Sequence, residues 1–253
     1  MYAAERQQSI LTVARTAGRV EVAALADELC VSPETIRRDL TNLERVGALR
    51  RVHGGAIPIE RLGFEPNVAT RAERSVAQKE RIAKAALDLV PQEGTILIDA
   101  GTTTLRLVEH LPRDRELTVV TNSLPVATAL AAAHSVQLFV LGGRFRPRTQ
   151  AMVGDWLVAA LGELTVDVAF LGTNGLSVER GLTTPDPAES QAKRAMVAAA
   201  KASIVLTDST KIGENHFSRF ARLEDIAALI TDTGLDDEGT HRIEAEGPQV
   251  IRA

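Results

Sequence analysis

The sequence predicts two domains of different class: a small helical domain that ends in a short hairpin, and an α/β domain built on a mainly parallel sheet. Apolar residues recur at helical spacing through the first 47 residues. Proline and glycine then interrupt the pattern between residues 56 and 67. Beyond that, apolar runs of strand length alternate with helical patterns, which is typical of a parallel sheet covered on both faces. A chain of 253 residues is long enough for two such domains.

Three helices are predicted in the first domain. Residues 5–16 and 22–29 each carry apolar side chains at helical spacing. A third helix begins with Ser32, which can cap its N-terminus, and with Pro33, whose fixed φ suits the first helical position. Gly47 closes this helix. Its apolar stripe consists of Ile36, Leu40, Leu43 and Val46.

The opposite face of the third helix is polar and cationic. It carries Glu34, Thr35, Arg37, Arg38 and Thr41. Residues 49–55 then alternate as a short hairpin does and include Arg50, Arg51, His53 and Gly54. The whole chain has a formal net charge of -4, whereas residues 37–51 hold five arginines against two acids. These arginines could form an ordinary solvated face, but the basic hairpin that follows favours an anionic partner.

A linker is predicted between the domains, which gives boundaries of 1–57 for the helical domain, 58–74 for the linker and 75–253 for the α/β domain. In the later part of the chain, helices are predicted over 71–90, 105–111, 124–133, 156–161 and 191–200. Strands are predicted over 95–98, 117–120, 136–141, 166–171, 203–206 and 226–230.

Small and polar residues follow five of the predicted strands. Because ligands of open α/β sheets bind at the carboxyl ends of the strands, these residues are candidates for one binding site. They are Asp99, Gly101, Thr102, Thr103, Thr104, Thr121, Asn122, Gly142, Gly143, Gly172, Asn174, Gly175, Asp208 and Lys211. The turn at 101–104 enters a helix, whose free N–H groups favour a phosphate, and Lys211 adds a positive charge. No G-x-x-x-x-G-K-[ST] or G-x-G-x-x-G string occurs, so a monophosphate is a better candidate than ATP or a dinucleotide.

Several of these residues also have a purely structural interpretation. Gly/Thr turns after strands are common in α/β proteins. Asp99, Asp167 and Asp208 can each cap a turn. Glu189 can be a favourable acid in the first turn of a helix. Both interpretations remain open at this point.

Composition excludes several other classes of protein. The apolar runs are shorter than the roughly 18 residues of a membrane span, and the first twenty residues lack a secretion signal, so we expect a cytoplasmic protein. One cysteine cannot form an internal disulfide, and the five histidines lack zinc-site spacing, so no metal and no cofactor are expected. Trp156 and Phe170 are expected in the core, and Cys30 buried between the second and third helices.

Two strings in the first domain resemble the DeoR family of bacterial transcriptional regulators: E-T-I-R-R-D-L, which begins at Glu34, and R-V-H-G-G-A, which begins at Arg51. The resemblance implies a winged helix-turn-helix that binds double-stranded operator DNA, with the third helix in the major groove and the hairpin as a wing. The residues implied in DNA binding are Ser32, Thr35, Arg37, Arg38, Thr41, Arg50, Arg51, His53 and Gly54.

The resemblance continues through the second domain. Asp99-Ala-Gly-Thr-Thr, Thr121-Asn122, Leu141-Gly-Gly143, Asp167-Val-Ala-Phe-Leu-Gly172 and Asp208-Ser-Thr-Lys211 look like the sugar-phosphate sensor of that family. This implies a repressor of a sugar operon that acts as a homo-oligomer, a dimer or a tetramer, and is released by a phosphorylated sugar. The opening M-Y-A-A-E-R string and residues 149–155 are most similar to the branch for fructose and phosphotransferase-system sugars, so fructose 1-phosphate is the first candidate effector. Its hydroxyls are expected near Asp99, Asp167, Asn174 and Glu189.

The family's sensor is similar in fold to ribose-5-phosphate isomerase, so the alternative is a sugar-phosphate isomerase with an appended helical domain. That enzyme uses an Asp-Gly-Ala-Asp segment, a Lys-Gly-Gly-Gly segment and a later glutamate. Here Asp167 keeps the first carboxylate, but Phe170 replaces the second, and Arg180-Gly-Leu182 stands where the lysine-glycine run is expected. Glu189 matches the glutamate, yet proton transfer also needs groups that hold the substrate. We therefore expect binding without turnover and assign no catalytic residue.

Overall fold

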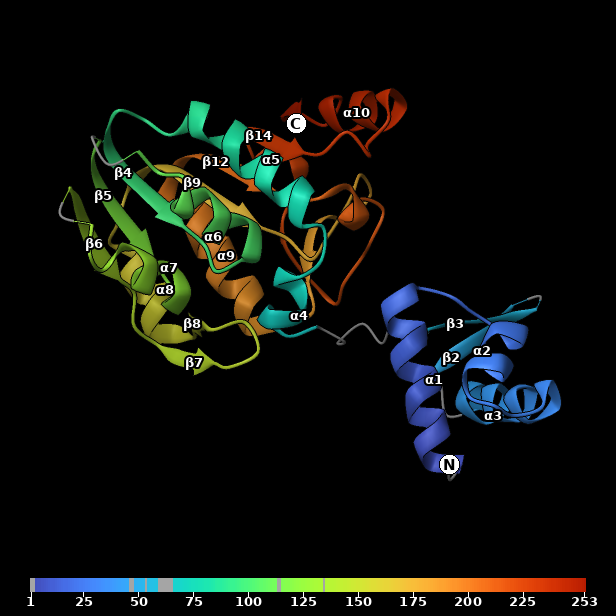
Figure 1. Ribbon diagram of the computed structural model, residues 1–253. Helices are drawn as coiled ribbons and strands as arrows, with labels where there is room; N and C mark the ends of the chain where they lie inside the picture. Colours follow the sequence, from blue (N-terminus) through green and yellow to red (C-terminus); the bar gives the residue numbers. More distant parts are fainter. Residues whose placement is uncertain (1–2, 46–47, 53, 59–65, 113–114, 134) are drawn as a thin grey trace. The chain divides into compact units, whose positions relative to one another are not determined.

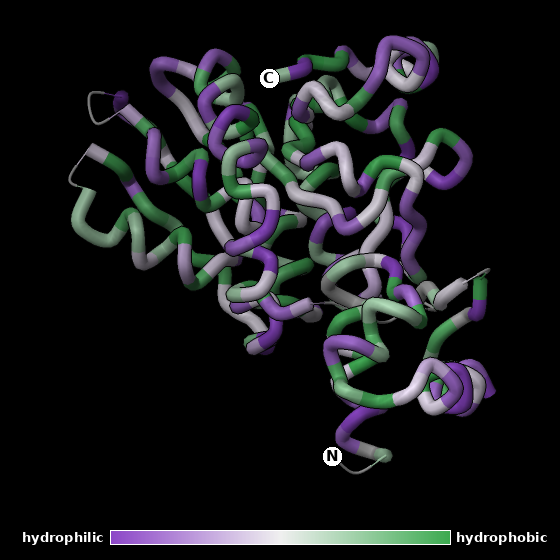
Figure 2. Tube along the Cα trace, turned by 45° about the vertical axis from the view of Figure 1, so that its right-hand side comes forward, coloured by the Kyte–Doolittle hydropathy of each residue, from purple (hydrophilic) through white to green (hydrophobic). Residues whose placement is uncertain are grey.

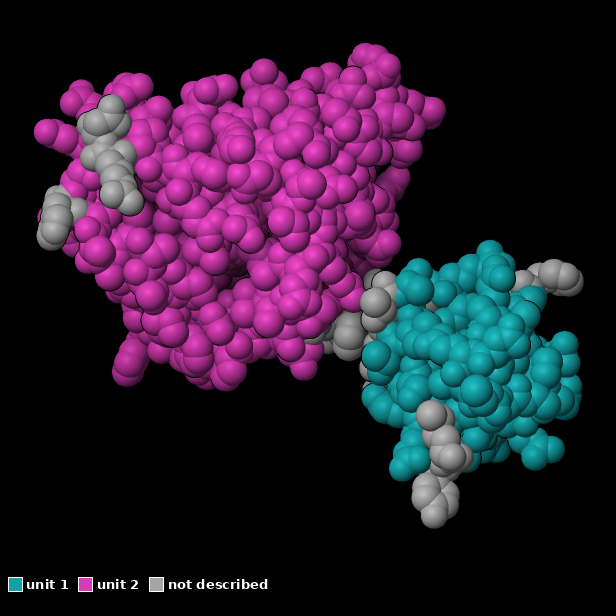
Figure 3. Space-filling model, in the orientation of Figure 1, with its two compact units in different colours: residues 1–64 teal, residues 65–253 magenta. Residues whose placement is uncertain are grey.

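The computed structural model describes the whole chain except residues 1–2, 46–47, 53, 59–65, 113–114 and 134. It divides into two compact units, Met1–Phe64 and Glu65–Ala253 (Figure 3). The second unit begins earlier than predicted, because residues expected in the linker form helix α4, Val68–Ala72. Asn67 caps α4: its Oδ1 accepts a hydrogen bond from Thr70 N at 2.8 Å.

The first unit is a winged helix-turn-helix. Its helices are α1 (Ala3–Ala17), α2 (Val22–Glu28) and α3 (Pro33–Arg45). Its strands β1 (Val20–Glu21), β2 (Leu49–Val52) and β3 (Gly55–Pro58) form an antiparallel sheet in the order β1-β3-β2. The core comprises Ile10, Leu25, Ile36, Leu40 and Leu49, each at most 1% exposed. Val46 and Gly47, which were expected to end the third helix, lie outside the described residues.

A seven-stranded sheet organises the second unit (Figure 1), and all its strand pairs are parallel. Its order is β15-β14-β12-β9-β4-β5-β6. The strands are β4 (Glu93–Ile98), β5 (Glu116–Thr121), β6 (Val136–Val140), β9 (Val166–Gly172), β12 (Ala200–Leu206), β14 (Ala228–Thr231) and β15 (Gln249–Arg252). The predicted parallel sheet is therefore confirmed, with β15 as an additional edge strand.

Helices cover both faces of this sheet. One face packs against α5 (Val76–Ala86), α6 (Thr102–Glu109) and α7 (Leu124–Leu130). The other packs against α8 (Asp155–Gly162), α9 (Pro187–Ala199) and α10 (Asp237–Glu244). Figure 2 shows hydrophobic stretches on the strands and mixed colours along the outer helices, as expected for strands buried on both faces. Phe170 is fully buried, as predicted.

Two small antiparallel sheets, which the sequence did not predict, complete the unit. One consists of β10 (Gly175–Ser177), β11 (Gly181–Thr184) and β13 (Ser218–Ala221). The other is the hairpin of β7 (Arg144–Arg146) and β8 (Ala151–Val153). Short 3-10 helices cover Leu87–Leu89, Ser209–Lys211 and Leu223–Asp225. No helix among the described residues is long and apolar enough to cross a membrane.

Three local predictions are wrong. The single helix expected over 71–90 is divided between α4 and α5, because Ser75 adopts a left-handed φ of 50°. Cys30 is exposed and has a φ of 52°, because the turn between α2 and α3 needs a left-handed residue there. Trp156 is 81% exposed, since α8 turns Leu157 and Leu161 into the core instead.

Candidate functional site

Helix α3 presents a polar surface in the first unit. Ser32 caps the helix by accepting a hydrogen bond from Thr35 N at 3.2 Å, and its hydroxyl pairs with that of Thr35 at 2.9 Å. Arg37, Arg38 and Thr41 are exposed, and Arg37 forms an ion pair with Glu34 at 3.0 Å. The predicted DNA-facing side chains therefore lie on the surface of α3.

The wing is tied to the same surface. Arg51 is exposed; its Nη1 donates to Thr41 Oγ1 at 3.0 Å, and its backbone N donates to Glu44 at 2.9 Å. Arg50 lies in β2, and Gly54 takes a φ of 79° in the turn. His53 lies outside the described residues. Helix α3 and the wing are thus in contact, and exposed arginines lie on both.

Asp39 does not reduce the positive charge of this surface as the sequence count suggested. It is only 3% exposed and accepts hydrogen bonds from Arg6 Nε at 2.6 Å and from Gln7 Nε2 at 2.9 Å. Because a buried carboxylate requires such partners, Asp39 fixes α3 against α1. It therefore lies on the buried side of α3, whereas the arginines of that helix are exposed.

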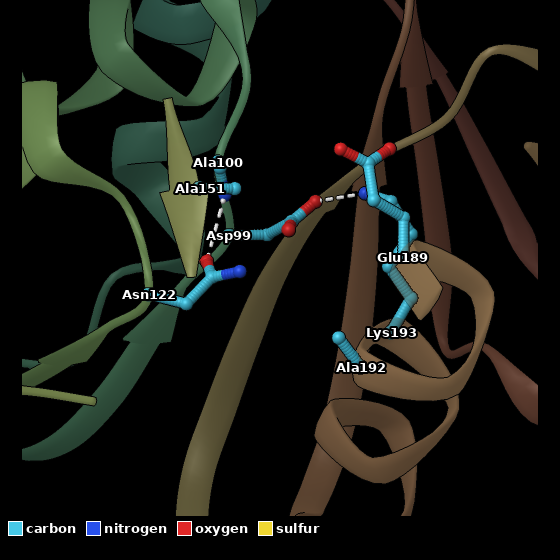
Figure 4. A pocket seen from close by; sticks show the side chains of 7 residues that line it. All are labelled: Asp99, Ala100, Asn122, Ala151, Glu189, Ala192 and Lys193. Carbon is cyan, nitrogen blue, oxygen red and sulfur yellow. Dashed lines mark hydrogen bonds and ion pairs between the residues drawn. The ribbon is translucent and has the colours of Figure 1, made fainter. Parts of the chain in front are cut away.

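A small pocket opens in the second unit at the crest, by which we mean the edge formed by the carboxyl ends of the parallel strands (Figure 4). Asp99, Ala100, Asn122, Ala151, Glu189, Ala192 and Lys193 line it. Asp99 follows β4 and Asn122 follows β5, whereas Glu189 and Lys193 come from α9. Three candidates from the sequence, Asp99, Asn122 and Glu189, therefore share one pocket.

Lys193 is the charged pocket residue that the sequence analysis did not predict. It is 5% exposed, its Nζ forms an ion pair with Asp99 Oδ2, and it also donates to Gly172 O at 2.9 Å. The ammonium lies 5.5 Å from the centre of the Phe220 ring. Asp99 Oδ2 accepts a second hydrogen bond, from Gly172 N at 3.0 Å. A buried, paired lysine gives the pocket a donor that a hydroxylated or anionic ligand can use.

Glu189 is 6% exposed and lies in a dense set of polar contacts. Its carboxylate accepts hydrogen bonds from Arg146 Nη1 at 3.1 Å, from Thr149 Oγ1 and from Thr184 Oγ1 at 3.3 Å. Asp186 caps α9 by accepting from Glu189 N at 3.0 Å. The first-turn role expected for Glu189 is thus combined with a place in the pocket wall.

Other predicted residues hold the crest in shape. Thr104 and Thr121 are fully buried, and their hydroxyls donate to Asp99 O at 2.7 Å and to Ile98 O at 2.6 Å. Asn122 bridges Ala100 N at 3.1 Å and Met152 O at 3.0 Å. The hydroxyls of Thr104 and Thr121 thus bind the backbone inside the unit and hold the strand ends in place.

The remaining candidates follow the ends of their strands but do not line the pocket. Gly101 caps α6, and Thr102 and Thr103 stand in its first turn. Gly142 and Gly143 follow β6, and Gly143 has a φ of 149° where an added Cβ would lie 2.7 Å from Val153 O. Gly175 begins β10 of the small sheet, and Asn174 precedes it. Asn174 O contacts His216 Nε2 at 3.1 Å.

Asp167 does not lie at the crest, where it was predicted to stand with the sugar-binding residues. It is the second residue of β9, and its carboxylate accepts from Lys201 Nζ at 2.8 Å and from Thr95 N at 2.9 Å. These two hydrogen bonds lower the pKa of Asp167. Because the strands are parallel, their first residues lie at the edge opposite their last residues.

Lys79, on α5, interacts electrostatically with several charged side chains of the second unit. Burial lowers the pKa of Lys79 to about 8, Asp208 opposes this change, and Lys211, Arg71 and Arg106 add to it. Lys79 also donates hydrogen bonds to the carbonyls of Arg71 and Arg74. Lys211 follows β12 at the crest, and its charge interacts with that of the buried Lys79. In the described part of the chain, no group of His, Cys, Asp or Glu side chains could hold a metal ion.

Comparisons with known proteins cover nearly the whole chain. Residues 6–61 match the DeoR-like helix-turn-helix domain, and residues 74–233 match the DeoR C terminal sensor domain. The HTH-type transcriptional regulator GlpR of Haloferax volcanii is 36% identical over 99% of this chain and 98% of its own. The putative aga operon transcriptional repressor of Escherichia coli O157:H7 is 31% identical over 98% of this chain and 93% of its own. The structure of ribose 5-phosphate isomerase A from Methanocaldococcus jannaschii aligns over 53% of each chain, with 18% identity and a TM-score of 0.39.

Proposed function

Because the chain belongs to the DeoR family of transcriptional regulators, we propose that it is the repressor of a sugar uptake or catabolism operon and that a phosphorylated sugar releases it from DNA. The observation that supports the effector most strongly is the pocket in which Asp99, Asn122, Glu189 and Lys193 converge. Carboxylates and amides bind sugar hydroxyls well. A relative of similar length is named as an operon repressor, which is consistent with the same role.

In the DNA complex, α3 enters the major groove and the wing contacts phosphates. Arg37, Arg38, Thr35 and Thr41 then face base edges or the backbone, while the buried stripe holds α3 to its unit. The wing residues Arg50, Arg51, His53 and Gly54 lie near phosphates, with Ser32 at the helix start. A homo-oligomer, a dimer or a tetramer, is the expected form, because helix-turn-helix proteins commonly read paired half-sites. We expect the protein to act in the cytoplasm, where operator DNA is found.

At the crest, the phosphate binds to the N–H groups at Thr102–Thr104, beside Lys79 and Lys211. The sugar hydroxyls then reach Asp99, Asn122, Glu189 and Lys193. Acidic groups repel a phosphate placed at the wrong end, so charge fixes the orientation of the ligand. Fructose 1-phosphate remains the first candidate. The protein has one state that binds the operator and one that does not. The effector weakens operator binding by the ratio of its own affinities for these two states.

A ligand panel tests this proposal. The full chain is heated with fructose 1-phosphate, fructose 6-phosphate, ribose 5-phosphate, unphosphorylated fructose and inorganic phosphate. A ligand that binds the folded protein at a hundred times its Kd raises the free energy of unfolding by about 2.7 kcal/mol. We expect a phosphosugar, and neither fructose nor phosphate alone, to raise the melting temperature and to displace the operator. A protein that no phosphosugar stabilises contradicts the proposal.

Lys211→Met provides the matched variant. It should weaken phosphosugar binding and leave operator binding unchanged. Lys201→Met is the control, because Lys201 is an exposed lysine that pairs with Asp167 at the opposite edge of the same sheet. If the two substitutions have equal effects on phosphosugar affinity, the phosphate does not bind near Lys211.

A further inference from the structure

The hairpin β7–β8 is both a wall of the pocket and a clamp on α9. Ala151 of β8 lines the pocket. Arg146 of β7 reaches the start of α9 and forms ion pairs with Asp186 Oδ2 at 3.2 Å and with Glu189 Oε1 at 3.1 Å. Thr149 is 3% exposed and donates its hydroxyl hydrogen to the same Glu189 oxygen. The turn of the hairpin is therefore held by a carboxylate that faces the pocket.

The same turn holds the first helical residue of the second unit. Val68 N, at the start of α4, donates a hydrogen bond to Arg148 O at 2.9 Å. The turn is tight: Gln150 N donates to Arg146 O at 2.8 Å, and Gln150 has a left-handed φ of 54°. Figure 1 shows the hairpin and α4 on the same side of the unit. In the sequence, α4 is the first helix after β3, the last strand of the first unit.

We propose that Arg146 and Thr149 are positioning residues that transmit effector binding from Glu189 to the segment entering the second unit. The proposal rests on the proposed function, because it needs a ligand in the pocket. A sugar hydroxyl that donates to Glu189 competes with Thr149 and Arg146 for the same oxygen. The turn at 146–150 then shifts, and the contact of Arg148 O with Val68 N shifts with it.

A packed turn suits this role, because a compact contact network switches between discrete arrangements instead of deforming gradually. Glu189 accepts hydrogen bonds from Arg146 and Thr149, which belong to the turn, and from Thr184 of β11. A ligand that changes the partners of this carboxylate therefore acts on the turn. The resulting change reaches α4 through the hydrogen bond from Val68 N to Arg148 O.

Arg146→Gln and Thr149→Val test the proposal, with fructose 1-phosphate as the probe. Titration calorimetry measures its affinity, and fluorescence anisotropy measures operator binding with and without it. We expect operator affinity without ligand to change less than about twofold and fructose 1-phosphate affinity less than about fivefold, while the effect of ligand on operator affinity falls at least about fivefold. Thr149→Ser keeps the hydroxyl and should restore the response. Arg144→Gln, an exposed arginine on the same strand, is the control.

Hydrogen exchange of amides 68–72 without ligand supplies a second readout. Arg146→Gln should accelerate exchange of the Val68 amide, and Arg144→Gln should not. If the parent protein neither binds nor responds to fructose 1-phosphate, that sugar is not the effector. The relay is then judged from the hydrogen exchange of Val68 alone. A parent that responds, together with Arg146→Gln and Thr149→Val variants that respond equally, overturns the relay. If Arg146→Gln does not fold, Thr149→Val and its serine counterpart decide the outcome.

Discussion

Replacing Lys193 by methionine should destabilise the second unit strongly, because the substitution keeps the length of the side chain and removes its charge. Asp99 Oδ2 would lose its ammonium partner and retain the N–H of Gly172 at 3.0 Å. The carbonyl of Gly172 would lose its hydrogen bond from Nζ, and the ring of Phe220 would lose the cation 5.5 Å from its centre. Lys193 and Asp99 are 5% and 2% exposed, so water cannot readily replace the lost partner.

The expected loss is about 3–5 kcal/mol of unfolding free energy, the usual cost of leaving one charge of a buried pair alone. For a unit of this size, that lowers the melting temperature by about 6–20 °C. Asp99→Asn should cost a similar amount. The double variant should lose less than the sum of the two, with a coupling of about 0.5–3 kcal/mol.

Urea denaturation and calorimetry of the full chain measure these losses in the transition of the second unit. Arg194→Met is the control, because Arg194 is the exposed neighbour on α9 and donates to Arg219 O at 2.8 Å. It should change stability by less than about 1 kcal/mol. If Lys193→Met is as stable as the control, or if the two pair substitutions are additive, the buried ion pair does not have the structural role inferred from its contacts.

Three further predictions concern both units. Gly55→Ala should destabilise the first unit and weaken operator binding, because the new Cβ would lie 1.9 Å from Val20 O in the β1–β3 pair. An unchanged denaturation midpoint of the first unit would refute this prediction. Arg38→Ala should cost about 1–3 kcal/mol on its own operator and relax sequence preference, whereas Arg51→Ala should weaken all DNA alike, as gel-shift series at several salt concentrations will show. Phosphosugar affinity should fall as pH rises above about 8, by up to about tenfold per pH unit. The reason is that the buried Lys79, whose pKa is lowered to about 8, loses the charge that attracts phosphate. A Kd that calorimetry finds constant from pH 7 to 9.5 speaks against this role.

Much of the crest could be predicted from sequence because topology alone gathers it. Once the strands are known to be parallel, their last residues share one edge, and so Asp99 and Asn122 meet in the pocket although they follow different strands. The same rule exposes the error at Asp167. The predicted strand 166–171 already places that residue at the opposite edge, where Thr95 N and Lys201 bind it.

The contribution of α9 could not be predicted in the same way, because a helix shows its orientation only through its apolar stripe. Glu189 and Lys193 are four residues apart, which in sequence is typical of a solvated i,i+4 ion pair. In the structure they lie on the buried side of α9 together with Ala192 and Met196, and each has a different partner: Arg146 for Glu189, and Asp99 for Lys193. Those partners come from elements 43 and 94 residues away in the chain, so no local pattern contains them. Polar residues on the inner face of a helix become evidence for a site only when the sheet beneath supplies oppositely charged groups, and that requires the tertiary structure.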